Sequence, residues 1–236
     1  MINLKISMLK FLADKATLLF LLSMTAGAVD TIGFLALGGL FAAHITGNIV
    51  ILAAHFVTGK FSQTGPLLAV PVFMIVLGIV TLIAGRMERA GFSLLSPLLV
   101  LQLLLLFGAL LLGITLGPFK NIDGLAAVST GMFAVAAMAA QSATVKLALK
   151  KAPSTVAMTN NITQLTLDLA RLVRWRQGTL DEMTAAQHQA KVTLMSILGF
   201  ILGCGMGAIL QNQFDFFALF FPFVLALFAL FLPRSY

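Results

Sequence analysis

The chain has 236 residues, of which 60% are hydrophobic and only 10% are charged, and its formal net charge is +7. A soluble globular domain has about 45–50% apolar and about 25% charged residues, so this composition excludes a soluble fold of this size. The mean hydropathy of +1.04 agrees with that exclusion. The sequence predicts a protein whose main partner is the lipid bilayer.

Eight largely apolar segments follow one another along the chain. A transmembrane helix needs about 20 mostly apolar residues to cross roughly 30 Å of hydrocarbon. Seven segments approach or exceed this length, and a more polar eighth lies between the fifth and the last two. The seven are 16–37, 39–58, 66–85, 96–117, 123–149, 191–210 and 214–232, and the eighth is 153–173. Their apolar residues are continuous and do not alternate, which excludes a transmembrane β-barrel. We expect an all-α polytopic protein that forms a single membrane domain over residues 1–236.

The positive charges lie where charges that orient a membrane protein usually lie. Almost every Lys and Arg is in a short stretch between apolar segments, and loops of this kind set the orientation of membrane helices. We therefore expect no nucleic-acid partner. The single Cys204 lies in an apolar segment, and the three histidines have no clustered carboxylates, so we expect neither a disulfide framework nor a metal site nor another cofactor.

Two similar pairs of motifs indicate an internal duplication. In the first half, AGAVD at 26–30 is followed by TGNI at 46–49. In the second half, AMAAQ at 137–141 is followed by TNNI at 159–162. Each pair consists of one polar residue among small ones and then a Thr-x-Asn-Ile sequence, and two more apolar segments follow each pair. We expect repeat one over about 16–117 and repeat two over about 123–232.

The distribution of Lys and Arg favours six full spans over eight. If all eight segments cross, the charges at 86, 89, 146, 150 and 151 lie on the side opposite the N-terminus. If 39–58 and 153–173 are broken or re-entrant, only Lys60 and Lys120 of the 15 basic residues lie there. The second arrangement fits the positive-inside rule better and makes the repeats inverted. It puts both termini in the cytoplasm, and eight spans stay the alternative.

Polar side chains inside the first two segments are candidate functional residues. Asp30 lies deep in its segment, where a charged group costs about 2.5–3.5 kcal/mol on insertion scales. We expect it to be a substrate or proton site, the alternative being a carboxylate that only satisfies the backbone or a partner side chain. His44, Thr46 and Asn48 form a polar cluster around Gly47, which lets the backbone unwind. The alternative for this cluster is hydrogen bonding between helices.

The second half carries a matching set of amides and hydroxyls. Its members are Gln141, Ser142, Thr159, Asn160 and Asn161. Amides in an apolar neighbourhood must be paired with one another, with backbone or with water, so we expect both sets to converge on one polar cavity near the midplane. We also expect that 46–48 and 159–161 are not regular helices. None of these residues is expected to be catalytic.

Several of these residues resemble a known family. The sequences AGAVD, FLALGGLF and HITGN at 26–30, 34–41 and 44–48 resemble the signature of the YoaK-like bacterial membrane proteins, a family with a domain of unknown function. MAAQS at 138–142 and STVAMTNN at 154–161 fit it too. The resemblance spans nearly the whole chain and implies a bacterial inner-membrane protein with about six spans. It implies no particular activity.

The leading functional hypothesis is a secondary transporter of a small polar solute, coupled to protons through Asp30 or His44. The alternative is a membrane scaffold, assembly factor or sensor whose polar residues only hold helices together. We expect no enzyme, because no Ser-His pair, paired carboxylates or metal constellation is present. No phosphate-binding loop for ATP is present either. A homo-oligomer is expected to use the small-residue face formed by Gly199, Gly203 and Gly207.

Overall fold

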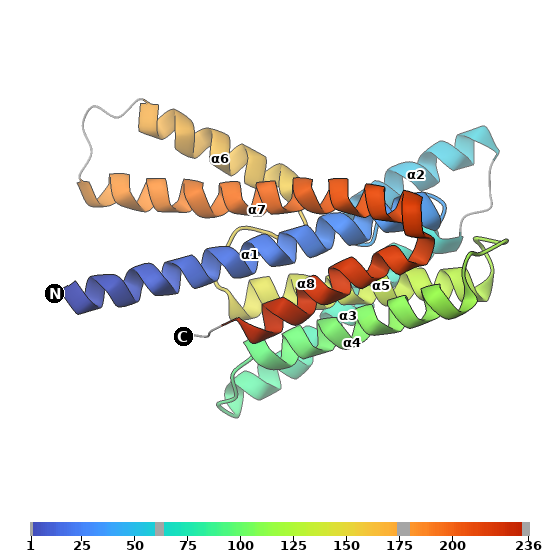
Figure 1. The fold of residues 1–236 in the computed structure, drawn as a ribbon, viewed down its shortest axis with the longest axis horizontal. Coiled ribbons are helices and arrows are strands. Elements are labelled where there is room, and N and C mark those ends of the chain that lie inside the picture. Colours follow the sequence, from blue (N-terminus) through green and yellow to red (C-terminus); the bar gives the residue numbers. More distant parts are fainter. Residues whose placement is uncertain (1, 60–63, 174–179, 233–236) are drawn as a thin grey trace.

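The chain folds as a bundle of helices (Figure 1). The structure is a computed structural model that describes residues 2–59, 64–173 and 180–232, and the described residues contain no strand. In chain order the elements are α1 (Ile2–Ala36), α2 (Ile45–Thr58), α3 (Thr64–Arg89), α4 (Leu95–Leu116), α5 (Leu125–Ala143), the π-helix η1 (Thr144–Ala148), α6 (Met158–Val173), α7 (Leu180–Phe214), the 3₁₀-helix η2 (Asp215–Leu219) and α8 (Phe220–Phe231). The predicted all-α architecture is confirmed.

Five of the described helical stretches are long and apolar enough to cross a membrane. They are Lys15–Ala36, Thr64–Arg89, Leu95–Leu116, Leu125–Ala148 and Met183–Phe231. The last of these has 49 residues and contains both α7 and α8, with a reversal at Asp215, whose φ of 49° is left-handed. The chain is therefore a multi-pass membrane protein. The helices α2 and α6 have only 14 and 16 residues, or about 21 and 24 Å, and fall short of the roughly 30 Å of hydrocarbon.

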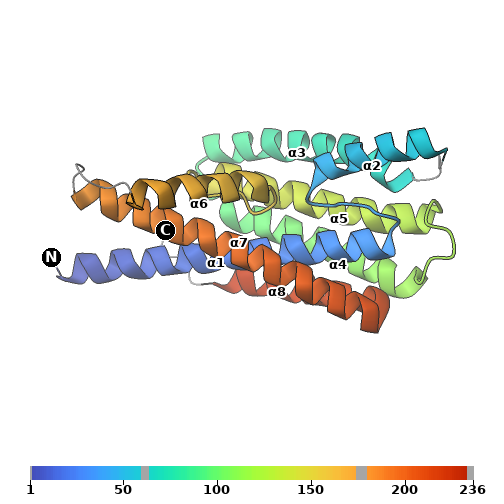
Figure 2. The same ribbon diagram turned by 90° about the horizontal axis from the view of Figure 1, so that it is seen from above.

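The two short helices start midway along the bundle (Figures 1 and 2). After α1 has crossed the bundle, segment 37–44 turns back beside it, and α2 then runs in the same direction as α1. The helices α5 and α6 have the same relationship towards the opposite end, with segment 149–157 as the returning loop. Each of the predicted segments 39–58 and 153–173 is therefore a loop followed by a short helix.

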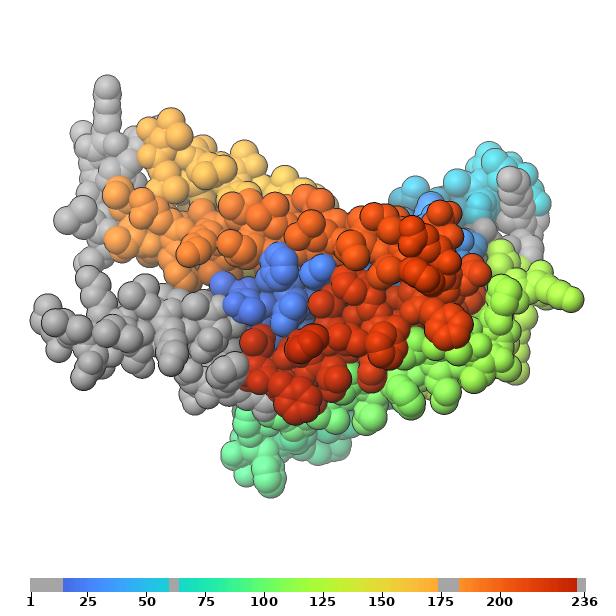
Figure 3. Space-filling view, in the orientation of Figure 1, coloured from blue at the N-terminus to red at the C-terminus, as the bar shows by residue number. Residues whose placement is uncertain are grey.

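The long helices pack most closely through small residues. The helices α7 and α8 both contact α1, and Figure 3 shows α1 exposed as a strip between them. A Cβ added to Gly203 of α7 would overlap the carbonyl oxygen of Met24, and one added to Gly207 would lie 2.9 Å from the Cα of Ala28. The expected glycine face thus packs against α1 of the same chain. In this structure these glycines have an intramolecular partner in α1, and a homo-oligomer stays a prediction.

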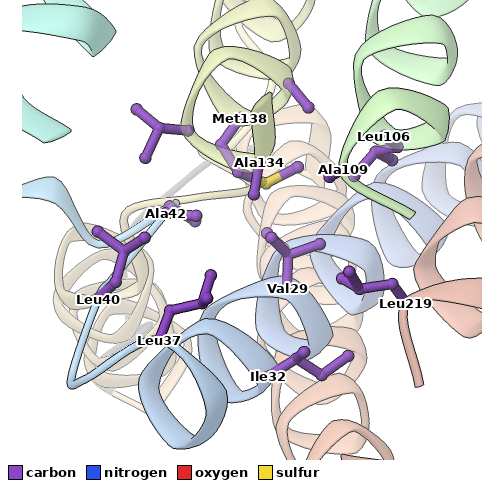
Figure 4. Packing of buried hydrophobic residues seen from close by; sticks show 14 of the residues in the cluster. Val29, Ile32, Leu37, Leu40, Ala42, Leu106, Ala109, Ala134, Met138 and Leu219 are labelled. Atoms are coloured by element: carbon purple, nitrogen blue, oxygen red, sulfur yellow. The ribbon is translucent and has the colours of Figure 1, made fainter. Parts of the chain in front are cut away.

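The centre of the bundle is apolar. Its main cluster joins α1, α4, α5 and the loop after α1, and it is closed by residues of η2. Figure 4 shows Val29 of α1 facing Ala134 and Met138 of α5, with Leu106 of α4 beside them. Val29 and Met138 are 1% and 0% exposed, so this region holds no space for a polar solute in the described conformation.

Candidate functional site

A tight turn at the end of α1 brings the chain back into the bundle. Gly38 and Gly39 both have left-handed φ angles, 66° and 83°, which cost glycine little. Leu40 then packs back on α1, where a Cβ added to Gly33 would lie 2.8 Å from its carbonyl oxygen. The returning chain reaches Asp30, six residues before Ala36 and therefore about 9 Å back along the helix.

Asp30 holds the returning loop through backbone hydrogen bonds. Its side chain is 4% exposed. The amide of Ala43 donates to Oδ1 at 2.6 Å, and the amide of His44 donates to Oδ2 at 3.0 Å and to Oδ1 at 3.3 Å. Hydrogen bonds to a charged group contribute about 1.5–3 kcal/mol each. The carboxylate therefore fixes the point at which α2 begins.

The two asparagines of the Thr-x-Asn-Ile motifs lock the loops before the short helices. Asn48 is fully buried; its Nδ2 donates to the carbonyl of Phe41 at 2.7 Å, and its Oδ1 accepts from the amide of Phe41 at 2.9 Å. Asn161 donates from Nδ2 to the carbonyl of Ser154 at 2.6 Å. Both asparagines bind the backbone seven residues earlier, so the repeated motif has a repeated structural role.

Gln141 is the centre of a second buried network. Its Nε2 donates to the carbonyl of Leu22 at 2.9 Å and to Oγ1 of Thr155 at 3.0 Å. Its Oε1 accepts from Nε2 of Gln102 at 2.7 Å. The network joins α1, α4, α5 and the loop before α6. Gln141 thus holds the second returning loop, as Asp30 holds the first.

Gln102 is a residue of this hydrogen-bond network that was not predicted from the sequence. It is fully buried in α4, and its Oε1 has no hydrogen-bond partner. The signal was present, because Gln102 is a single amide in a run of leucines and valine. A buried acceptor without a partner costs about 1–3 kcal/mol. Helix packing alone does not explain why a residue with this cost occupies the position.

The side chains of the other candidate residues make none of these hydrogen bonds, and His44 takes part in the Asp30 network only through its backbone amide. His44, Thr46, Thr159 and Asn160 are exposed, and Ser142 is half-buried. The ring of His44 makes only an edge contact with the ring of Phe41.

The expected irregular backbone at 46–48 and 159–161 is wrong, since both stretches lie in the first turn of α2 and α6. The irregular backbone comes just before each motif, where Asn48 and Asn161 replace the missing helical bonds.

The two short helices also share a polar position further along. Seven residues beyond Asn48 and Asn161 lie His55 and Asp168. His55 Nδ1 and Asp168 Oδ2 are buried and have no hydrogen-bond partner, whereas the other carboxylate oxygen of Asp168 accepts from Gln164 at 2.8 Å. Each short helix therefore carries a titratable side chain at the same position.

The two polar networks do not meet in this structure. Leu22, which Gln141 binds, and Asp30 are eight residues apart on α1, or about 12 Å. Ala26 and Val29 lie between them and belong to the apolar core. A cavity of about 580 Å³ lies at the end of the bundle where α3 finishes, and none of the nine candidate residues lines it. Within the described ranges, no three His, Cys, Asp or Glu side chains form a group that could hold a metal ion.

Comparisons with known proteins agree with the resemblance in residues 26–48 and 138–161. The model of a family described as "Protein of unknown function (DUF1275)" matches residues 18–232. The chain is 32% identical over 223 residues to the UPF0700 transmembrane protein YoaK of Bacillus subtilis (strain 168), and the match covers 90% of this chain and 91% of the relative. No solved structure matches significantly. The predicted family is confirmed.

Proposed function

This chain belongs to the DUF1275 family of proteins of unknown function, and we propose that it is a secondary transporter of a small polar solute. The observation that carries the proposal is the pair of short helices, α2 and α6, which start midway along the bundle and run towards opposite ends. In secondary transporters with inverted repeats, the solute site lies near the midplane at such interrupted helices.

The pattern of helix contacts supports an inverted internal repeat, with one repeat over 16–117 and the other over 123–232. α1 packs on α7 as α5 packs on α3; α2 packs on α3 as α6 packs on α7; and α8 packs on α1 as α4 packs on α5. Each contact becomes its counterpart when the two halves are exchanged. A two-fold axis in the membrane plane produces this exchange, and it predicts six full spans plus two short helices.

The starts of the short helices offer a solute groups that a continuous helix lacks. The first four N–H groups of a helix have no partner within it, and the helix N-terminus carries a partial positive charge. In α2 and α6 these groups lie beside the loops that Asp30 and Gln141 hold. Because apolar packing separates the two networks, transport requires the halves to move relative to one another. Asp30, as a carboxylate at this position, is the group that we propose to exchange a coupled proton.

The charge distribution supports a bacterial cytoplasmic membrane with both termini inside. At one end of the bundle lie the basic residues in the last turns of α3 and α6 and those in and just after η1, namely Arg86, Arg89, Arg171, Lys146, Lys150 and Lys151. Among the described residues of the loop at the opposite end, Lys120 is the basic one. Cytoplasmic loops carry the excess of Lys and Arg, so we propose that the first end faces the cytoplasm.

Cysteine labelling in intact cells tests this topology. The single native cysteine is first replaced as Cys204→Ala, and Arg89→Cys, Lys150→Cys and Lys120→Cys are then made one at a time. A membrane-impermeant thiol reagent should label the Lys120 variant from outside and the other two only after the membrane is opened. Labelling of the Lys150 variant from outside would overturn the inverted arrangement.

Transport itself is tested with purified protein. A panel of amino acids, organic acids, sugars and inorganic ions is screened for thermal stabilisation, since a ligand that binds the folded state raises its apparent stability. Uptake of each stabilising solute is then measured in proteoliposomes. Saturable uptake that falls in Asn48→Ala and Asn161→Ala supports the proposal, whereas stabilisation without uptake, or a panel with no stabilising member, counts against it.

One observation favours the second candidate, a scaffold, assembly factor or sensor. Asp30, Asn48, Gln141 and Asn161 are all hydrogen-bonded within the protein and do not line a shared cavity. Polar residues that only join helices have this arrangement. The uptake measurement separates the two candidates, because a scaffold gives no solute flux.

A further inference from the structure

A sizeable cavity lies at the end of the bundle that carries most of the basic residues. The cavity of about 580 Å³ is bordered by Lys15 of α1, by the end of α3 with the loop to α4, and by the π-helix η1 with the residues after it. Lys15, Leu95 and Leu149 line it from these three sides, and Ala148 of η1 is a half-buried part of its wall. A space of this volume is large enough for a small solute.

The charged residues of the cavity give it a net positive character. Lys150 and Glu88 form an ion pair of 3.2 Å at the cavity, with side chains that are 72% and 60% exposed, so that side is open to its surroundings. Lys15, half-buried, lines the same cavity and has no ion pair with any acidic side chain that the structure describes. The positive charge of Lys15 is therefore not neutralised by the lining.

Three helices lead from this cavity to the Gln141 network. On α4, Leu95 lines the cavity, Leu99 follows one turn deeper, and Gln102 lies about 10 Å from Leu95 along the axis. Along the end of α5 and η1, Leu149, Val145 and Gln141 follow in the same order.

On α1 the corresponding residues are Lys15, then Leu18 and Leu19, then Leu22, whose carbonyl binds Gln141. Along all three helices an apolar layer separates a charged cavity from a buried polar network.

This layer is one packed cluster. Leu18, Leu19, Leu22, Leu95, Leu99, Val145, Leu149, Val192 and Ala229 form it, and all are 7% exposed or less. Beyond it lies Gln102 Oε1, a buried acceptor without a partner. A closed apolar constriction between a wet cavity and a polar site excludes water and ions.

We propose that the cavity is a vestibule that admits a small soluble anion, and that the cluster of Leu18 to Ala229 is its closed gate towards Gln102 and Gln141. The inference rests on the proposed function, since a gate requires a path for a solute. It adds the chemical class of that solute, an anion such as a carboxylate or phosphate, and the end from which the solute reaches the centre.

The charge preference of the vestibule is measured with thiol reagents of opposite charge. In Cys204→Ala protein, Ala148→Cys is reacted with the anionic sulfonate reagent MTSES and the cationic ammonium reagent MTSET, and each rate is divided by the rate with free cysteine. The normalised rate should be higher for MTSES than for MTSET. In Lys15→Gln the MTSES rate should fall about fivefold and the MTSET rate should rise about fivefold, so that their ratio falls about thirtyfold, because one positive charge at roughly 4 Å in water attracts the anion and repels the cation by about 1 kcal/mol each. Lys146→Gln, an exposed residue of η1 outside the lining, is the matched control and should leave the ratio unchanged.

The gate is tested with Gln102→Cys, which places a thiol on the far side of the apolar cluster from the cavity. This variant should not react with MTSES while the cluster is intact, and it should react once Leu99→Ala opens the layer. Leu106→Ala is the matched control. Leu106 lies one turn beyond Gln102, is as buried as Leu99 and belongs to the main apolar cluster at the centre of the bundle, not to the proposed gate. Gln141→Cys repeats the test without altering Gln102, and size-exclusion profiles confirm that each variant is folded.

Three results would overturn the inference. Equal normalised rates for the two reagents at position 148 would remove the anion preference. If Leu106→Ala and Leu99→Ala made the Gln102→Cys variant equally reactive, the result would indicate general loosening instead of a gate. A preference for MTSES in phosphatidylcholine nanodiscs that vanishes in phosphatidylglycerol nanodiscs would assign the cavity to a lipid headgroup. These results do not depend on solute uptake, so they fail separately from the transport proposal.

Discussion

Asn48 and Asn161 make the same hydrogen bond in the two halves of the chain. Each side-chain amide donates to the carbonyl of the residue seven positions earlier, Phe41 at 2.7 Å and Ser154 at 2.6 Å. Both asparagines lie in the first turn of a short helix that begins after a returning loop. A buried carbonyl in such a loop has lost its helical partner and needs another, and the asparagine supplies it in both places.

Asn161→Ala should lower the free energy of unfolding by about 0.5–1.5 kcal/mol, the contribution of a typical buried hydrogen bond. Asn48→Ala should cost more, because Asn48 bonds both the amide and the carbonyl of Phe41. Thermal unfolding in detergent measures both changes. Asn160→Ala is the control, since Asn160 is exposed. If it destabilises the protein as much as Asn161→Ala, the loop-locking role is wrong.

Asp30→Asn should destabilise the protein less than Asp30→Leu. The amide oxygen of asparagine still accepts from one of the two donors, Ala43 or His44, whereas leucine leaves both amides without a partner. Each stranded donor costs about 1–3 kcal/mol. If Asp30 also exchanges a coupled proton, Asp30→Asn should make solute uptake independent of pH. Uptake measured across a pH series decides this, and an unchanged pH profile would remove Asp30 from the coupling step.

Gly203→Ala should separate α1 from α7 and lower the thermal unfolding midpoint, because the added methyl group overlaps the backbone carbonyl of Met24. Gly205→Ala, two residues away on the same helix, is the control. A Cβ there meets nothing within 4 Å, and alanine is favoured over glycine inside a helix by about 0.8–1 kcal/mol. The two substitutions should therefore have effects of opposite sign. Two losses of equal size would contradict the close packing of α1 on α7.

Gln102→Leu and Gln141→Leu should be coupled in a double-mutant cycle. Each single change leaves the other side chain with a stranded polar atom, whereas the double change removes both partners of the 2.7 Å bond. The coupling energy for residues in one network is about 0.5–3 kcal/mol. Unfolding midpoints of the four proteins give this energy. Strict additivity would show that the bond does not contribute to stability.

Local composition was sufficient to predict much of this protein. The apolar segments predicted the long helices, since burial in lipid depends on a continuous run of residues along one helix. The paired motifs around Asp30 and Gln141, together with the few basic residues, indicated that 39–58 and 153–173 are interrupted. The prediction misplaced each interruption by a few residues, because the side chain of Asn48 or Asn161 completes the bonds before the helix and leaves the motif itself helical.

What the amino-acid sequence determined by itself is therefore the membrane class, the family, the order of helices and the residues that are too polar for lipid. The tertiary structure decided which groups those residues meet. Gln141 bonds Leu22 and Gln102, which come from two other helices, and Gly203 packs on α1 instead of a second copy of the chain. These partners depend on the rotation and depth of each helix against its neighbours, which residue spacing within a single helix does not specify. The cavity beside Lys15 likewise exists only because parts of α1, α3 and η1, which are distant in the chain, border one space.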